Sequence, residues 1–451
     1  MRVERWEGMD SLLVRGGILV TMREGDQPRR GDLLVRDGRI VALGGELTAP
    51  PGVPVLDGRG RAVLPGLVQA HVHLNQTLFR GAADDLELLP WLRERIWPLE
   101  AAHDADSVYW AALLACAELL RGGTTWVASM ETVHHTQAVL AAVEHAGLGA
   151  VVGKALMDRG EGVPKGLLQD PQEAVAEAAA LHDAWNGRGG GRLRVAFCPR
   201  FALSCSSELF ALVREAAACR GALVHTHAAE NRRETALVRR LTGMGNVAYL
   251  DSLGLTGPRL MVAHAVHLEE AEVGLLARTD TRVVHCPTAN LKLGSGIAPV
   301  AGLLDAGVTV ALGADGAPCN NNLDAWAELR LAALLQKVAV GPAALPARRA
   351  LPLVAREGAR ALGLAEEMGT LEPGKRGDLC LVELEGVHQE PAGDEWSRLV
   401  YATRAADVVA TVVGGEVLCL GGQLTRLDER RIRREARRAF RRVAVRARMG
   451  S

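Results

Sequence analysis

Apolar positions follow one pattern at the two ends of the chain and a different pattern in the middle. Residues 11–64 and 377–424 read as short β-strands, because apolar runs there are interrupted by Gly and Asp-Gly. The stretch Arg36-Asp37-Gly38 is typical of a tight hairpin turn. Since both ends share this texture, we predict that together they build one small β domain.

The middle of the chain alternates apolar runs with segments of helical spacing, such as 107–123 and 171–187. Near-continuous apolar runs are typical of buried parallel strands. Eight such runs occupy residues 66–74, 124–130, 149–156, 192–200, 222–230, 259–268, 281–289 and 308–316. Eight strand–helix units predict a (β/α)8 barrel, with an open doubly wound sheet as the alternative.

The predicted architecture is therefore α/β, a TIM-like barrel with a small β domain built from both chain ends. We place the first part of the β domain at 1–65, the barrel at 66–370, the second part of the β domain at 371–425 and an Arg-rich C-terminal helix at 426–451. Apolar residues recur at helical spacing in this helix, at Ile432, Ala436, Phe440 and Val443. We expect it to pack that stripe and solvate its charges. A basic patch for an anionic partner is the alternative.

Composition excludes several classes of protein. Apolar residues make up 48% and charged residues 23% of the 451 positions, which excludes a disordered, collagenous or disulfide-dense chain. The net charge of −1 argues against a nucleic-acid partner. The eight cysteines show no C-x-x-C spacing, and no apolar run suits a secretory signal or a membrane helix. We expect a cytoplasmic protein without membrane contact. We also expect a homo-oligomer, either a dimer or a tetramer.

Titratable side chains stand at the ends of five predicted strands, where barrel enzymes carry their active residues. His71 and His73 are two positions apart on a strand and therefore face the same way. The other strand ends carry His225, His227, Glu230, His264, His267, His285 and Asp315. Three imidazoles and one carboxylate suit a borderline divalent ion such as Zn2+ or Fe2+. Any single histidine could instead be a core residue, and this interpretation stays open for His225 and His285.

The ordered motifs resemble the amidohydrolase superfamily, and most of all its aminohydrolases that act on purines and related heterocycles. They are PGLVQAHVHL, HTHAAE, MVAHAVHL, HCPTANLKLGSGIAP and GADGAPCNNNLD, within a match from about residue 10 to about 425. The resemblance implies the same (β/α)8 barrel, and it implies that the small domain built from both chain ends is a β-sandwich. It also implies one divalent ion, Zn2+ first with Fe2+ or Mn2+ as alternatives, held by His71, His73, His227 and Asp315.

The same resemblance implies a hydrolytic deamination of a small heterocycle that releases ammonia. Glu230 resembles the proton shuttle of these deaminases, and His264 resembles the histidine that orients the attacking water. Asp315 would also accept a proton from that water. Because all of these residues are present in the sequence, a barrel that has lost its activity is disfavoured.

The segment after H-x-H indicates which heterocycle is bound. Residues 78–100 are similar to S-adenosylhomocysteine and 5'-deoxyadenosine deaminases, which implies that Trp91 and Glu100 close on a nucleoside. Glu100 would then accept hydrogen bonds from the ribose hydroxyls. We therefore expect an adenosine-type nucleoside, modified at its 5' position, as the substrate.

Other residues favour different substrates. Arg200 together with Gln76 resembles guanine deaminases, and the HLNQ stretch resembles s-triazine hydrolases, including chlorohydrolases. A guanine or pterin-type aminohydrolase and an s-triazine hydrolase are therefore the alternatives. Cys319 lies four residues after Asp315, at a pocket-floor position that varies among these activities. Its thiol could touch the leaving group or simply pack in the core.

Overall fold

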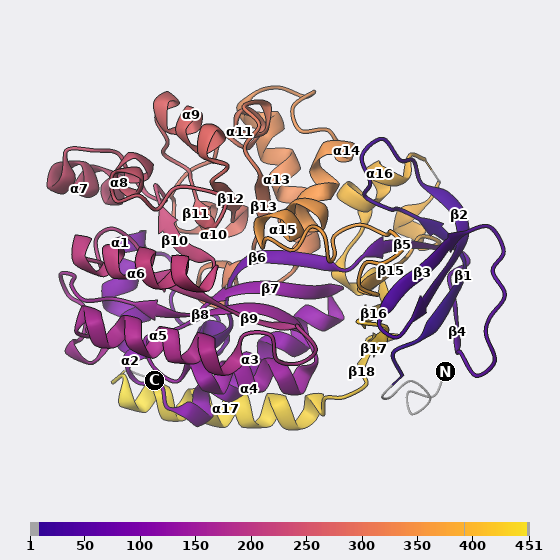
Figure 1. The fold of residues 1–451 in the computed structure, drawn as a ribbon, viewed down its shortest axis with the longest axis horizontal. Helices are drawn as coiled ribbons and strands as arrows, with labels where there is room; N and C mark the ends of the chain where they lie inside the picture. Colours follow the sequence, from indigo (N-terminus) through magenta and orange to yellow (C-terminus); the bar gives the residue numbers. More distant parts are fainter. Residues whose placement is uncertain (1–8, 392, 449–451) are drawn as a thin grey trace.

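Figure 1 shows a barrel on one side of the molecule and a sheet built from both chain ends on the other. This computed structural model describes residues 9–391 and 393–448. No helix within those ranges is long and apolar enough to cross a membrane.

The barrel sheet has nine strands, all paired in parallel, in the order β13-β12-β11-β10-β9-β8-β7-β6-β14. The strands β13 and β14 stand at opposite ends of that order although they follow each other in the chain. The sheet therefore closes on itself, and the predicted barrel is confirmed. The strands are β6 (Leu67–His73), β7 (Thr124–Met130), β8 (Gly149–Leu156), β9 (Leu193–Pro199), β10 (Val224–Ala228), β11 (Leu260–His264), β12 (Arg282–His285), β13 (Val310–Leu312) and β14 (Asp315–Gly316).

Two predicted strands differ from the structure near the candidate site. The run 308–316 is broken between β13 and β14, and Asp315 directly after the break has a positive φ of 63°. The run 281–289 stops at His285, because Pro287 begins the short helix α10 (Pro287–Lys292) and proline favours the first helical turn. After these breaks lie Asp315 and Asn290, whose side chains contact histidines of the candidate site.

Helices surround the strands of the barrel (Figure 1). The two predicted helical segments form α3 and α5, where Asp104 and Asp170 cap the first turns with their side chains. The helices are α1 (Leu88–Trp91), α2 (Trp97–Ala101), α3 (Ala105–Arg121), α4 (Thr136–Ala146), α5 (Pro171–Trp185), α6 (Ser207–Arg220), α7 (Arg232–Thr242), α8 (Asn246–Ser252), α9 (Glu270–Thr279), α10, α11 (Val300–Asp305), α12 (Ala317–Asn320), α13 (Ala325–Ala339), α14 (Ala347–Ala350), α15 (Arg356–Ala361), α16 (Glu395–Ser397) and α17 (Glu429–Arg446).

The second sheet joins the two ends of the chain, as predicted. Its order is β18-β17-β16-β15-β5-β1-β2-β3, with β4 beside β1, and β15 pairs with β5 so that Leu379 lies opposite Pro65. The hairpin at Asp37 and Gly38 has φ values of 50° and 72°, as a tight turn of this kind requires. The strands are β1 (Leu12–Leu19), β2 (Arg29–Arg36), β3 (Arg39–Gly44), β4 (Val55–Asp57), β5 (Arg61–Pro65), β15 (Leu379–Glu383), β16 (Val408–Val413), β17 (Glu416–Leu420) and β18 (Gln423–Leu424). The division of the chain at 65, 370 and 425 stays a prediction.

The C-terminal helix α17 lies along the outside of the barrel, at the lower edge of Figure 1. Its apolar stripe is buried against α3 and the turn 74–79, as predicted. Ala439 joins the expected residues in this stripe, and Phe440 is only half-buried. Packing therefore accounts for one face of the helix and leaves the arginines on the other.

Candidate active site

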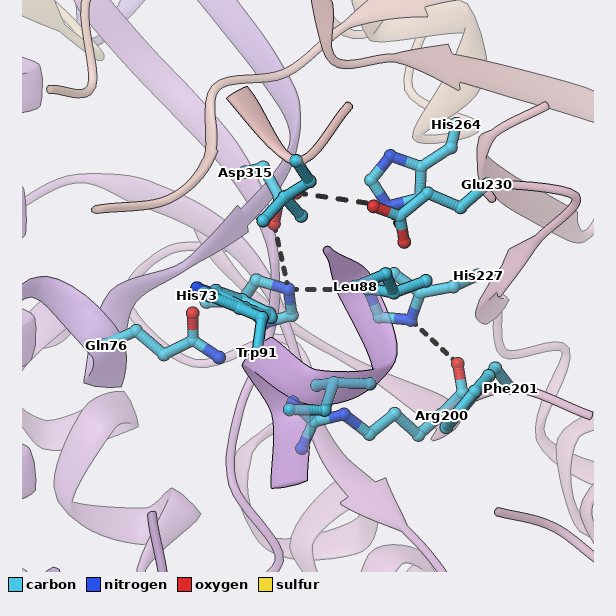
Figure 2. A pocket seen from close by; sticks show the side chains of 12 residues that line it. His73, Gln76, Leu88, Trp91, Arg200, Phe201, His227, Glu230, His264 and Asp315 are labelled. Atoms are coloured by element: carbon cyan, nitrogen blue, oxygen red, sulfur yellow. Dashed lines mark hydrogen bonds and ion pairs between the residues drawn. The ribbon is translucent and has the colours of Figure 1, made fainter. Parts of the chain in front are cut away.

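The predicted metal ligands converge near the carboxyl ends of β6, β10 and β13. His71 and His73 end β6, His227 lies on β10, and Asp315 begins β14. Asp315 Oδ1 lies 3.4 Å from His71 Nε2 and 3.2 Å from His73 Nε2. His73 Nε2 lies 3.4 Å from His227 Nε2. Four side chains that span 245 positions of the sequence therefore point their donor atoms at one place. Figure 2 shows three of them, His73, His227 and Asp315.

The backbone around this place is held in uncommon conformations. Ala229, His264 and Asp315 have positive φ values of 54°, 77° and 63° although none is glycine. Such conformations cost free energy and persist where the surrounding structure fixes them, often at functional sites. Here they turn His264 and Asp315 out of their strands and into the barrel mouth.

Hydrogen bonds to the imidazole rings determine which ring nitrogen is protonated. His73 Nδ1 lies 2.6 Å from the carbonyl oxygen of Met130, and His227 Nδ1 lies 2.7 Å from that of Arg200. A carbonyl can only accept, so each Nδ1 carries the proton and each Nε2 presents a lone pair. His71 Nδ1 is 3.0 Å from His225 Nε2, so those two rings share one proton. These are the outer contacts expected of metal-binding histidines.

His264 is arranged in the opposite way. Its Nδ1 lies 3.0 Å from the amide nitrogen of Asn290, which can only donate. The neutral ring must therefore carry its proton on Nε2, which lies 3.4 Å from Glu230 Oε2 and 3.9 Å from Asp315 Oδ2. His264 thus presents an N–H donor where His73 and His227 present lone pairs.

The donor set fits a divalent metal ion. The ligand atoms of His71, His73 and Asp315 lie within 4.8 Å of one another, and so do those of His71, His227 and His264. His71 Nε2 is buried and makes no hydrogen bond with any described residue. Imidazole nitrogens with one carboxylate are ligands typical of Zn2+ and similar ions. The tautomers favour His73 over His264 as the third imidazole.

Burial sets the protonation states that metal binding needs. It lowers the pKa of His71 and His227 below the ordinary value and that of His264 to about 3, so the rings are neutral at pH 7. Burial opposes ionisation of Asp315, but contacts with His71 and His73 outweigh it and hold the pKa of Asp315 well below its usual range. Neutral imidazoles and an ionised carboxylate are the forms that bind metal ions.

Glu230 has the opposite tendency. Its carboxyl group is buried, and burial, the charge of Asp315 and the neighbouring Glu234 together raise its pKa well above the ordinary value. The raised pKa favours the protonated form of the side chain, from which it can donate a proton. Its position beside His264 and Asp315 is shown in Figure 2.

A small pocket opens beside these groups. Of the expected substrate residues, Gln76, Trp91 and Arg200 line it. Figure 2 shows them across His73 and His227 from Glu230 and His264. The wall is completed by apolar residues that sequence reasoning missed: Leu88, Leu92, Phe201 and Leu293. A pocket with apolar and aromatic residues on one part of its wall and hydrogen-bonding groups on the other suits a heterocyclic ring.

Glu100 and Cys319 do not line this pocket. Glu100 is buried behind the wall, where its carboxylate lies 2.6 Å from Arg200 Nη1 and accepts a bond of 2.8 Å from Gln76 Nε2. A contact with ribose would require these bonds to be exchanged. Cys319 is buried in the core with its Sγ 3.1 Å from the Gly316 carbonyl oxygen, as its packing interpretation predicts.

Sequence reasoning assigned no individual role to Asn290 and left the role of His225 open. Both are completely or almost completely buried, and each contacts one candidate site histidine. Asn290 lies within HCPTANLKLGSGIAP, one of the motifs that carry the family resemblance. The ring nitrogens of His285 make no hydrogen bond with any described residue. His285 therefore has no demonstrated partner in the site.

A closed barrel with this set of histidines and an aspartate at its mouth defines a metal-dependent hydrolase. The family model for the Amidohydrolase family matches residues 62–418, and the chain belongs to this family. Its resemblance to the family is thereby confirmed.

Named relatives cover nearly the whole chain. A "5-methylthioadenosine/S-adenosylhomocysteine deaminase" from Pelotomaculum thermopropionicum is 38% identical over 441 residues, 96% of this chain and 99% of the relative. A "5'-deoxyadenosine deaminase" from Methanothermobacter thermautotrophicus is 39% identical over 403 residues, 89% and 92% of the two chains. The crystal structure of an adenosine deaminase from Xanthomonas campestris with bound zinc has a TM-score of 0.90 and 34% identity, covering 96% and 98%.

Proposed function

We propose that the protein is a metal-dependent hydrolytic deaminase of an adenosine-type nucleoside, of the 5'-deoxyadenosine, 5'-methylthioadenosine or S-adenosylhomocysteine class. The products are the corresponding inosine analogue and ammonia. The observation that carries the proposal is the position of Glu230, a buried carboxyl group with a raised pKa, beside the N–H donor of His264 and the ionised Asp315. The names of the relatives at 38% and 39% identity support the substrate class.

His71, His73, His227 and Asp315 would hold one divalent ion, for which we propose Zn2+, with Fe2+ or Mn2+ as alternatives. When bound, such an ion lowers the pKa of a water molecule towards ~7 and polarises an attacked carbon–nitrogen group. The zinc in the Xanthomonas campestris structure supports this choice.

The chain's own residues then move the protons. Asp315 accepts a proton from the attacking water, and the Nε2–H of His264 orients the oxygen. Glu230 donates its proton to the ring nitrogen next to the carbon that carries the amino group. Water adds at that carbon as a hydroxyl group. Asp315 then passes the proton it took from water to the amino nitrogen, the carbon–nitrogen bond breaks and ammonia leaves. The hydroxyl proton passes to Glu230, which regains its acid form. The ring carbon becomes a carbonyl.

A second candidate substrate is guanine or a related pterin. Arg200 and Gln76 both line the pocket, and a guanidinium group can donate to O6 and N7 of guanine. An s-triazine hydrolase is the remaining alternative, because a triazine ring fits the same apolar wall. In each case the metal and proton chemistry is unchanged.

A substrate panel tests the proposal. Purified protein loaded with Zn2+ is given 5'-deoxyadenosine, 5'-methylthioadenosine, S-adenosylhomocysteine, guanine and a chlorotriazine, and ammonia release is measured for each. We expect the highest kcat/KM for one of the three nucleosides. A higher kcat/KM for guanine or chloride release from the triazine would contradict the nucleoside assignment.

We further propose a cytoplasmic homo-oligomer, a dimer or a tetramer. The eight cysteines form no disulfide with one another, and seven are buried, which is typical of a reducing compartment. Light scattering on the purified protein measures the oligomer directly.

A further inference from the structure

The outward face of α17 has no role in the proposed reaction. Residues 429–446 contain nine arginines and two glutamates, a net charge of +7 on one helix of a chain whose total is −1. The near-neutral net charge of the whole chain therefore conceals one strongly basic surface. The expectation of no nucleic-acid partner was based on that net charge.

Several contacts fix this helix firmly to the barrel. Its apolar stripe is buried, and Arg431 lies over the ring of Trp110 at 5.6 Å. At the C-terminal end Arg446 lies 2.6 Å from Asp104, and Arg442 pairs with Asp106. The arginines that point away from the barrel are thus presented on a rigid support.

Six exposed arginines form what we call the arginine face: Arg430, Arg433, Arg434, Arg437, Arg438 and Arg441. Glu429 pairs with Arg433 at 3.8 Å, and Glu435 pairs with Arg434 and Arg438. Within the described part of the chain, Arg430, Arg437 and Arg441 have no ion pair or hydrogen bond. Half of the arginine face therefore lacks a counter-charge.

This arrangement opposes helix stability. Like charges four positions apart destabilise a helix, and the arginine face contains four such pairs, from 430/434 to 437/441. Since the opposite face already anchors the helix, packing does not require these arginines. The repulsion would be relieved by an anionic ligand.

The shape of the arginine face indicates which anion fits. At 3.6 residues per turn the six side chains span an arc of about 140° over about 16 Å of helix axis. A flat anionic bilayer would meet only the centre of that arc, and the apolar stripe that could enter lipid is buried in the protein. The major groove of B-form DNA is about 12 Å wide, close to the width of a helix, and has phosphates on both sides.

We propose that the arginine face of α17 binds the phosphate backbone of double-stranded DNA, without base specificity. Six contacts predict a slope of about −5 for the logarithm of the association constant against the logarithm of salt concentration. Affinity should fall roughly 10³-fold between 50 and 200 mM salt.

Fluorescence anisotropy with a labelled 20-base-pair duplex and the full-length protein tests this. We expect the triple variant R430A/R437A/R441A to lose about half of the salt slope and at least tenfold in affinity at 50 mM salt. The variant R430K/R437K/R441K should retain most of the affinity, because lysine still neutralises phosphate. The matched control R30A/R240A/R330A removes three exposed arginines from β2, α7 and α13 and should bind like the wild type.

Further probes give outcomes that decide the question. Deamination activity and circular dichroism of the triple Ala variant should match the wild type, since the arginine face lies outside the pocket. An RNA duplex should bind more weakly than DNA, because its major groove is too narrow to admit a helix. The proposal is overturned if the wild type does not bind DNA at 50 mM salt or if the control variant loses as much affinity. Stronger binding to an RNA duplex, or to vesicles containing phosphatidylserine, also overturns it.

Discussion

The amide nitrogen of Asn290 lies 3.0 Å from Nδ1 of His264 and so leaves the imidazole proton on Nε2. This one contact distinguishes His264 from the histidines whose Nδ1 donates to a carbonyl. It provides a reason why His264 would hydrogen-bond the attacking water while His73 and His227 bind the metal.

The first prediction concerns this contact. In Asn290→Asp a carboxylate faces Nδ1 and draws the proton there, so Nε2 loses its donor. We expect kcat to fall by about 10²–10³-fold, as for other lost oxyanion donors. Nitrogen NMR of labelled protein should show the changed tautomer of His264. Asn290→Ala imposes no tautomer and should lose less activity; equal losses with an unchanged tautomer would contradict the assignment.

The second prediction concerns the metal. A chelator should abolish activity, and Zn2+, Fe2+ or Mn2+ should restore it. His73→Ala should bind substoichiometric metal by atomic absorption, because one of four ligands is missing. His145→Ala changes an exposed histidine on α4 and serves as the control. Full activity in protein without metal would rule out the mechanism.

The third prediction separates proton transfer from metal binding. Glu230→Gln keeps the size of the side chain but cannot donate a proton, so we expect normal metal content and a kcat lower by about 10²–10⁴-fold. Because the pKa of Glu230 is raised, wild-type kcat/KM should fall as the pH rises through that pKa and the acid is lost. The control is Glu234→Gln. Glu234 accepts a hydrogen bond from the backbone N–H of Glu230 but does not line the pocket, so this variant should lose less kcat. Loss of metal in Glu230→Gln would instead identify Glu230 as a ligand.

The fourth prediction concerns the buried pair of Glu100 and Arg200. Removal of the carboxylate in Glu100→Ala leaves Arg200 buried without a partner, which should lower the free energy of unfolding by about 3–5 kcal/mol. If Glu100 also binds ribose in the substrate complex, Glu100→Gln should raise KM for the nucleoside roughly 10- to 150-fold more than for the free base. Glu161→Gln changes an exposed carboxylate and should alter neither value. Equal increases for nucleoside and base would favour Arg200 and Gln76 as the guide to the substrate.

The fifth prediction concerns stability and pH. Burial raises the pKa of Glu328 from 4.5 to about 7. Between pH 4.5 and pH 7 the carboxyl group is therefore protonated in the folded protein and ionised in the unfolded chain. Its contribution to the free energy of unfolding therefore falls as the pH rises from 4.5 to 7. The difference in the free energy of unfolding between Glu328→Gln and the wild type should shift by roughly 2–3 kcal/mol in favour of the variant as the pH rises from 5 to 8. Urea unfolding at both pH values measures this, with the exposed Glu46→Gln as the control; a difference that does not change with pH would show that Glu328 keeps an ordinary pKa.

The sequence by itself determined the strands and the kinds of side chain at their ends. The runs 124–130 and 149–156 form β7 and β8 with the same bounds. A parallel strand covered on both faces must be apolar along its whole length, so its sequence shows an unbroken apolar run. The two-residue period likewise put His71 and His73 on the same side of β6. Local geometry is sufficient for these predictions, since each depends on neighbours within a few residues.

Only the tertiary structure decided which distant groups meet. Glu100 pairs with Arg200 across 100 positions, and Asn290 reaches His264 from the next strand–helix unit. The break that gives Asp315 its positive φ appears only when β14 closes the barrel against β6. Such contacts also determine the tautomers of the site histidines, the raised pKa values of Glu230 and Glu328, and which face of α17 is exposed. They depend on burial and distance after closure, which no local pattern of residues contains.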